Sequence, residues 1–188
     1  GVDMSSVIHP KADLSQAVTT TTMAAGAVTE AIEETTNISP QIKWVNDVYL
    51  DGKKICGILT EAQTDFESGQ VQSIIIGIGV NIGIDHLPPE LQGIVGSLPS
   101  ASFKRNELIA KITNHLLPMA LHPEDKAYLA TYRSHSMVIG HPITYYFRGD
   151  AFSAKAIGID DEGGLIIKKE DGSVDILKSG EISLRLSS

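Results

Sequence analysis

The spacing of apolar residues changes several times along the chain. Residues Val2–Ile8 follow the alternation of a strand, and apolar side chains then recur every three or four positions, as on one helical face. This spacing predicts a helix over Leu14–Glu34, with Asp13 and Gln16 in the positions of a capping box. The β-branched threonines at 19–22 lower its intrinsic helix propensity, so we expect the helix to depend on tertiary packing.

Short runs of β-type residues come next. They predict strands at Ile42–Trp44, Asp47–Leu50 and Lys53–Glu61. Asp51-Gly52, between the last two strands, is a strong hairpin signal because both positions of a type I′ turn need a positive φ. The apolar run Ile74–Ile82 predicts a central strand that is buried on both faces.

Helical spacing returns in the following part of the chain. Gly83–Ser102 is a predicted loop with a short helical turn, and apolar residues from Leu108 to Met119 form one helical stripe. Pro123 suits the first turn of a further helix that reaches about Arg133. Strands followed by helices indicate an α+β fold.

Beyond Val138 the pattern consists of short β-runs separated by glycine-containing turns. Such runs at close spacing predict a small barrel. The runs lie at Ile143–Phe147, Ala151–Ile159, Leu165–Lys169, Val174–Leu177 and Glu181–Leu186. We therefore divide the chain into a larger domain over residues 1–137 and a small C-terminal β-barrel domain over residues 138–188.

Composition narrows the class of protein. The chain has 15 Lys and Arg residues against 23 Asp and Glu, and its net charge of −8 argues against a surface that grips nucleic acid. The longest apolar runs are about half of the roughly 20 residues that span a bilayer, so we expect no membrane segment. Cys56 has no second cysteine for an internal disulfide, and we expect a cytoplasmic location.

Charged and amide residues gather around the predicted hairpin. Lys43 and Lys54 could bind phosphates, Asp47 could bind a magnesium ion, and Asn46 could bind a base or a ribose. These residue types suit a nucleoside triphosphate. An ordinary charged hairpin would carry them too, so the residue types alone leave both interpretations open.

Other residues carry weaker signals. Gly77 and Gly79 fail the dinucleotide motif at its third glycine, and they fit either a flat ligand close to the backbone or a bulge. The six histidines show no metal-ligand spacing, which argues against a zinc site. Cys56 lies among apolar residues and is expected to be a buried structural thiol.

Three sequence blocks resemble those of one family. Lys43–Glu61 reads Lys-Trp-Val-Asn-Asp and then Lys-Ile-Cys-Gly-Ile-Leu, which resembles the Lys-Trp-Pro-Asn-Asp and Lys-(Ile/Leu)-Ala-Gly-Ile-Leu motifs of biotin protein ligases. Gly77–Ile82 resembles that family's Gly-x-Gly-(Ile/Val)-Asn strand. Gly180–Arg185 resembles the Gly-Glu-(Ile/Val)-Ser-Leu-Arg ending of its C-terminal domain. Three blocks in the family's order are more specific than any single motif.

The resemblance implies a fold and an activity. The fold is the α+β biotin ligase catalytic fold, similar to class II aminoacyl-tRNA synthetases, with a mixed sheet packed with helices and a small β-barrel after it. The implied enzyme condenses biotin with ATP to biotinyl-5′-AMP and releases pyrophosphate. It then transfers biotin to one lysine of the biotin carboxyl carrier domain of acetyl-CoA carboxylase.

The resemblance also implies roles for individual residues. The family's essential lysine corresponds to Lys54, which becomes the expected catalytic residue and part of the biotin site. Gly57, Leu59, Gly77 and Ile78 would line the biotin side, because glycine lets a bicyclic, mostly apolar vitamin lie flat against backbone.

The nucleotide side would be formed by a second set of residues. Lys43, Asn46, Asp47 and Asn81 correspond to family positions implicated in binding ATP and Mg²⁺, and Asp47 is the expected metal ligand. Val45 stands where the family has proline, which should only loosen the turn before Asn46.

The resemblance leaves other expectations to be tested. Because the chain starts at Gly1 within a predicted strand and lacks the family's Gly-Arg-Gly-Arg loop, we expect an N-terminal part to be missing and this chain alone to be inactive. The open edge of the first strand, and pairing that is common in the family, lead us to expect a homodimer.

Two alternative functions stay open. The first is a non-catalytic ligand-sensing and dimerisation part of a biotin-operon repressor, and DNA would be a partner only if an upstream helix-turn-helix exists in the parent protein. The second is a relative of lipoate ligases, although the block around Lys54 favours biotin.

Overall fold

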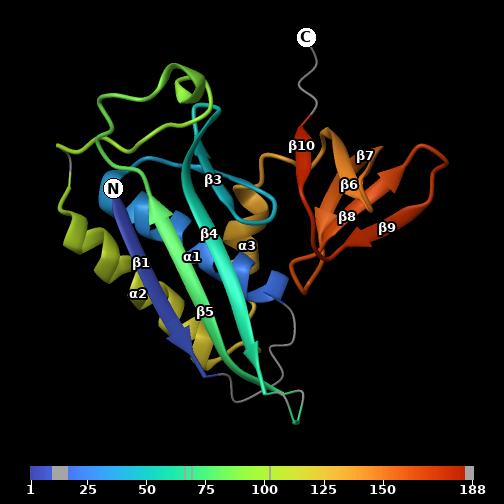
Figure 1. Cartoon of the computed structure of the whole chain (residues 1–188), viewed down its shortest axis with the longest axis horizontal. Coiled ribbons are helices and arrows are strands. Elements are labelled where there is room, and N and C mark those ends of the chain that lie inside the picture. Colours follow the sequence, from blue (N-terminus) through green and yellow to red (C-terminus); the bar gives the residue numbers. More distant parts are fainter. Residues whose placement is uncertain (10–16, 66, 69, 102, 185–188) are drawn as a thin grey trace.

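The computed structural model describes residues 1–9, 17–65, 67–68, 70–101 and 103–184. Two five-stranded sheets organise the chain, and Figure 1 shows them side by side. The first sheet has the order β1-β5-β4-β3-β2 and contains β1 (Val2–Ile8), β2 (Gln41–Lys43), β3 (Asp47–Leu50), β4 (Lys53–Thr64) and β5 (Val71–Val80).

The helices pack with the first sheet. Helix α1 (Ala17–Thr36) contacts strands β2 to β5 as well as α2 (Arg105–Leu121) and α3 (Tyr128–Ser134). The loop after β5 holds one short 3₁₀ helix, Pro89–Leu91. In Figure 1 the helices lie behind the sheet, so its other face is turned towards the viewer.

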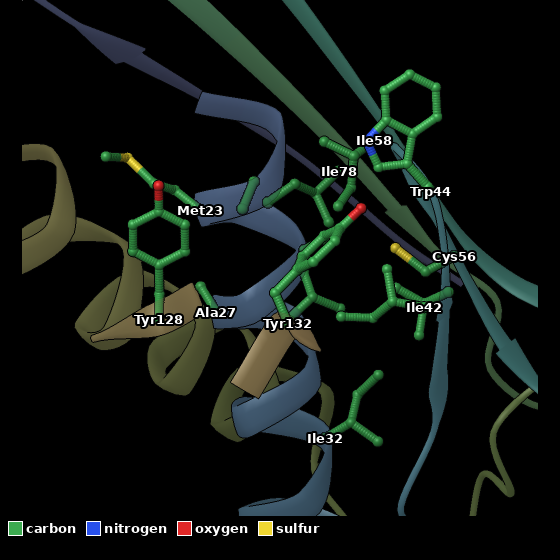
Figure 2. Packing of buried hydrophobic residues seen from close by; sticks show 14 of the residues in the cluster. Met23, Ala27, Ile32, Ile42, Trp44, Cys56, Ile58, Ile78, Tyr128 and Tyr132 are labelled. Carbon is green, nitrogen blue, oxygen red and sulfur yellow. The ribbon is translucent and has the colours of Figure 1, made fainter. Parts of the chain in front are cut away.

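Small side chains bring α1 close to its neighbours. Ala24, Ala27 and Ala31 are fully buried, and an added Cβ at Gly26 would lie 3.5 Å from Tyr128 of α3. Figure 2 shows core side chains around this helix: Met23, Ala27 and Ile32 from α1, Ile58 and Ile78 from the sheet, and Tyr128 and Tyr132 from α3. The core therefore fills the space between α1 and one face of the first sheet.

The second sheet has the order β10-β6-β7-β8-β9. Its strands are β6 (Pro142–Phe147), β7 (Asp150–Ile159), β8 (Leu165–Lys169), β9 (Val174–Leu177) and β10 (Ile182–Leu184). The expected small barrel is not closed, because no ladder joins β9 to β10 in the described part of the chain. The turn pattern specifies hairpins between successive strands, whereas closure needs the two outermost strands to pair.

The α+β fold class is confirmed, and several elements agree closely with their predictions. Strand β1 has the predicted bounds, and Asp51 and Gly52 both have positive φ angles of 50° and 74° in the β3–β4 hairpin. The pairs between strands are antiparallel, and the parallel part of the expected mixed sheet is confined to isolated bridges such as Lys54 with Val95. The predicted cap residues Asp13 and Gln16 lie outside the described residues.

Two other predictions need correction. The last helix does not begin at Pro123, because Asp125 first closes a turn with His122 and its carboxylate accepts a hydrogen bond from Ala127 N. Helix α3 therefore starts at Tyr128. Strand β5 lies between β1 and β4 and is buried on one face only, since buried and half-buried residues alternate along it.

No helix among the described residues is long and apolar enough to cross a membrane.

The core position of Cys56 predicts a dependence of stability on alkaline pH. Burial raises the pKa of this thiol to about 12, so the unfolded chain loses the thiol proton at a lower pH than the folded chain. The contribution is fully present below the unfolded pKa and is lost as the pH rises towards the folded pKa, by up to about 1.4 kcal/mol per pH unit.

Urea unfolding of the wild type and of Cys56→Ala between pH 8 and 11 isolates this contribution (roughly the range of an ordinary thiol and above). We expect the wild type to lose more stability than the variant over that range. Parallel losses in the two proteins would contradict the assigned environment of Cys56.

Candidate functional site

A β-bulge aims the side chain of Lys54 at the open face of the first sheet. Cys56 pairs with Val48, whereas Lys54 pairs with the very next residue of β3, so Ile55 is the extra residue. In a regular strand, residues 54 and 57 would point to opposite faces. The bulge reverses this relation, and an added Cβ at Gly57 would lie 3.3 Å from Cε of Lys54.

An ion pair joins Lys54 to Asp47 above this bulge. Nζ of Lys54 lies 2.6 Å from Oδ1 of Asp47, and the side chains are 38% and 17% exposed. Oδ1 is buried and accepts no hydrogen bond of good geometry from the described residues. The lysine charge therefore compensates a carboxylate that has lost most of its water. Burial, and after it the charge of Asp47, also raises the pKa of Tyr49.

The segment between β2 and β3 is held to β4 and α3 by backbone and side-chain hydrogen bonds. The Asn46 side chain donates to the carbonyl of Ile58 at 3.0 Å, and the amide of Ile58 donates to the carbonyl of Asn46 at 2.9 Å. Tyr132 of α3 donates to the carbonyl of Val45 at 3.1 Å. Nζ of Lys43 lies 5.9 Å from the ring centroid of Tyr49. As a result, the Lys43 and Lys54 cations, the Asn46 amide and the Asp47 carboxylate lie around one hollow.

That hollow is a pocket of about 430 Å³ between the two sheets. One wall comes from the 43–47 segment, β4 and α1, and the other from the residues that lead into β10. The lining residues are Thr21, Lys43, Trp44, Val45, Asn46, Asp47, Lys54, Ile58, Leu59, Thr60, Gly180, Glu181 and Ile182. The pocket thus brings together five of the residues singled out in the sequence: Lys43, Asn46, Asp47, Lys54 and Leu59.

Two of the predicted glycines extend this site along the open face of the sheet. Gly57 pairs with Gly79, and Leu59 pairs with Gly77. Leu59 is 61% exposed, so its side chain stands on this face beside a row without bulky neighbours. A flat apolar molecule could therefore contact backbone here.

The other two predicted residues have different surroundings. Ile78 is 2% exposed and points into the core, as Figure 2 shows, so only its backbone could face a ligand. Asn81 does not line the pocket, and its backbone joins β4 to the following loop. Its amide donates to the carbonyl of Ile55 at 2.8 Å, and its carbonyl accepts from Leu98 at 2.9 Å.

Some lining residues carried no assigned role in the sequence. Thr21 and Thr60 join across the pocket wall through a hydroxyl hydrogen bond of 3.0 Å. Gly180, Glu181 and Ile182 belong to the third sequence block, which pointed to a domain but not to this contact. Only the pairing of distant segments reveals their place at the site.

No group of three or more His, Cys, Asp or Glu side chains among the described residues could hold a metal by itself. A magnesium ion bound mainly through phosphates needs only one or two carboxylates, so the buried Asp47 oxygen fits such an ion.

Comparisons with known proteins give the family of the chain. The Biotin/lipoate A/B protein ligase family model matches residues 4–81, and the Biotin protein ligase C terminal domain model matches residues 138–185. The first match defines the class as biotin and lipoate ligases. The second match narrows it, and the chain belongs to the biotin protein ligase family.

Curated relatives carry the description Bifunctional ligase/repressor BirA. The protein from Bacillus spizizenii is 34% identical over 194 residues, which cover 98% of this chain and 58% of that protein. The Escherichia coli protein is 29% identical over 152 residues, which cover 77% of this chain and 46% of that protein. This chain therefore spans about half the length of these relatives.

Solved structures agree with the fold. Biotin protein ligase from Aquifex aeolicus in complex with biotin and ATP has a TM-score of 0.82 and 26% identity, covering 98% of this chain and 78% of that chain. The apo structure from the same organism also has a TM-score of 0.82, with 82% of that chain covered. The expected biotin ligase fold is thereby confirmed.

Proposed function

We propose that the natural protein containing this chain is an ATP-dependent biotin protein ligase. The observation that carries the proposal is the Lys54–Asp47 pair of 2.6 Å in a pocket beside an open, glycine-rich sheet face. The pocket offers charges to a nucleotide, and the sheet face offers backbone to an apolar vitamin. A similar ligase has been solved with biotin and ATP, which supports the same pair of substrates here.

Lys54 is the proposed catalytic residue. A carboxylate and the α-phosphate of ATP repel each other, and a cation about 4 Å from both contributes on the order of 4 kcal/mol per contact at an effective dielectric near 20. Attack at phosphorus and later attack on biotinyl-5′-AMP both build charge on oxygen atoms. One lysine on the open face can stabilise both steps.

The remaining roles follow the geometry of the two areas. Gly57, Leu59, Gly77 and the backbone of Ile78 form the proposed biotin side, on the face where Leu59 is exposed. Lys43, Asn46 and Asp47 form the proposed nucleotide side. Asn81 does not line the pocket, and its assignment to the nucleotide rests on the family motif alone. Asp47 would hold a magnesium ion, which when bound would neutralise charge on the phosphates of ATP.

The partners and the domain division are proposals of the same kind. The acceptor is a lysine of the biotin carboxyl carrier domain of acetyl-CoA carboxylase. Use of ATP and a buried free thiol at Cys56 support a cytoplasmic location. We also propose two domains that meet at Val138, because the second family match begins there.

Replacing Lys54 with alanine tests the catalytic assignment. In the natural protein, adenylation should fall by roughly 10²–10³-fold, the scale for removal of one electrostatic stabiliser. Pyrophosphate release measures this step. Lys53→Ala is the matched control, because Lys53 is the neighbouring, exposed hairpin lysine and does not line the site pocket. Unchanged pyrophosphate release in Lys54→Ala would remove this residue from the mechanism.

Replacing Asp47 with asparagine tests the division between the two substrates. Magnesium-dependent ATP binding should weaken more than biotin binding, because the change removes a hard anionic oxygen but no apolar contact. Calorimetry with each ligand measures the two affinities. Asp51→Asn serves as control, since asparagine tolerates the positive φ of this turn position. Equal losses for both ligands would refute the separate roles.

The proposed homodimer is tested by light scattering. Strand β1 lies at the edge of the first sheet, and Val7 on this strand is 59% exposed. Unpaired edges recruit other chains, so we expect a dimer or larger species. Val7→Lys should shift the mass towards the monomer, because a charge on an edge strand opposes pairing. A monomeric wild type at all concentrations would refute the proposal.

A further inference from the structure

One turn of the second sheet makes several polar contacts with the rest of the molecule. This is the Asp160–Gly164 turn between β7 and β8, hereafter the docking turn. It is closed internally, because Oδ1 of Asp160 accepts from the amides of Glu162 at 2.9 Å and Gly164 at 2.7 Å. Its shape is therefore stabilised by hydrogen bonds within the turn itself.

Two side chains of the larger domain, residues 1–137, donate hydrogen bonds to carbonyls of the docking turn. The indole nitrogen of Trp44 donates to Gly163 at 2.9 Å, in a buried contact. The hydroxyl of Thr19 donates to Glu162 at 2.9 Å. Both donors belong to the larger domain, so these bonds exist only while the second sheet packs against that domain.

Two ion pairs flank these bonds. Lys126 lies 2.5 Å from the carboxylate of Glu162, and Arg133 lies 2.7 Å from that of Asp161. Arg133 also donates through Nε to the carbonyl of Ile159 at 3.0 Å. The docking turn is thus held by α1, by α3 with the residues before it, and by the segment after β2.

The fit of the docking turn requires glycine at position 163. Its φ is +88°, and an added Cβ would lie 2.7 Å from Oγ1 and 2.9 Å from Cγ2 of Thr22. Gly172, in the β8–β9 turn, has a similar φ of +85° but nothing within 4 Å of the added Cβ. Alanine would strain the backbone at both positions but would disturb the contact with α1 only at Gly163.

Trp44 connects this contact to the proposed active site. It is 3% exposed and stands between Lys43 and the Asn46-Asp47 pair, so it belongs to one wall of the pocket. Its partner Gly163 belongs to the sheet whose Gly180–Ile182 segment forms the opposite wall. The spacing of the two walls therefore depends on how the docking turn packs against Trp44 and α1.

We propose that Trp44 and Gly163 are positioning residues that hold the two walls of the nucleotide pocket at their working distance. This inference rests on the proposed function, because it assigns ATP to the pocket. Neither residue needs to touch ATP. Their hydrogen bond fixes the 43–47 segment against the second sheet, and loss of it would leave the pocket loosely assembled.

The test compares three variants of the 188-residue chain, which contains all residues assigned to ATP: Gly163→Ala, Trp44→Phe and the matched control Gly172→Ala. Calorimetry measures binding of ATP with Mg²⁺, and circular dichroism measures the melting temperature. Trp44→Phe keeps a six-membered aromatic ring and removes the N–H donor together with the pyrrole part of the indole. Gly172→Ala strains the backbone as Gly163→Ala does, but its added methyl group meets no neighbouring atom.

We expect Gly163→Ala and Trp44→Phe each to raise the Kd for ATP about tenfold, a ratio equivalent to about 1.4 kcal/mol. Gly172→Ala should lower the melting temperature through backbone strain but leave the Kd unchanged. The inference is overturned if Gly172→Ala weakens ATP binding as much as Gly163→Ala. It is also overturned if both interface variants bind ATP like the wild type.

Fluorescence gives a second readout that does not depend on any ligand. Trp44 is the one tryptophan of the chain, so its emission reports on the docking turn directly. Gly163→Ala should shift the emission to longer wavelength and increase quenching by acrylamide, whereas Gly172→Ala should change neither. Unchanged emission in Gly163→Ala would overturn the docking itself.

The two readouts separate this inference from the proposed function. If the wild-type chain does not bind ATP while its emission responds as expected, the assignment of ATP to this pocket fails and the positioning role in nucleotide binding fails with it. If the wild type binds ATP but the interface variants do so equally well, only the positioning role fails.

Discussion

Close packing of α1 is the constraint on which the rest of the structure depends. Ala24, Ala25, Ala27 and Ala31 are fully buried, and this lets the sheet, α2 and α3 all reach one helix. At its N-terminal end, the threonines that lower helix propensity have a structural use. Thr19 reaches the second sheet and Thr21 lines the pocket, so tertiary contacts compensate for poor intrinsic propensity.

Covering one face of the sheet leaves the other face available for chemistry. The bulge at Ile55 then decides which side chains appear there. Without it, Lys54 and Gly57 would lie on opposite faces, and the lysine would have no space above the glycine. A local irregularity of one residue thus creates the ion pair with Asp47, while the strand pairing on either side stays regular.

The sequence specified the strands and the hairpin well because alternation and an Asp-Gly turn are local signals. Residue-type reasoning also found Lys43, Asn46, Asp47 and Lys54, which lie close in the chain. It could not find contacts between distant segments, such as Trp44 with Gly163, or the bulge, which apolar alternation does not encode. Ile78 was expected beside the ligand, but its side chain is in the core, because a motif names positions without giving the face of the strand.

The ion pair at the centre of the site has a physical consequence for ligand binding. Asp47 is only 17% exposed, so removing its lysine would leave a buried charge without compensation. Any anion that attracts Lys54 competes with Asp47 for it, and a cation near Asp47 would relieve that competition. The proposed binding of magnesium with ATP supplies both charges together, which explains why one carboxylate and one lysine can lie 2.6 Å apart and still serve a polyanionic substrate.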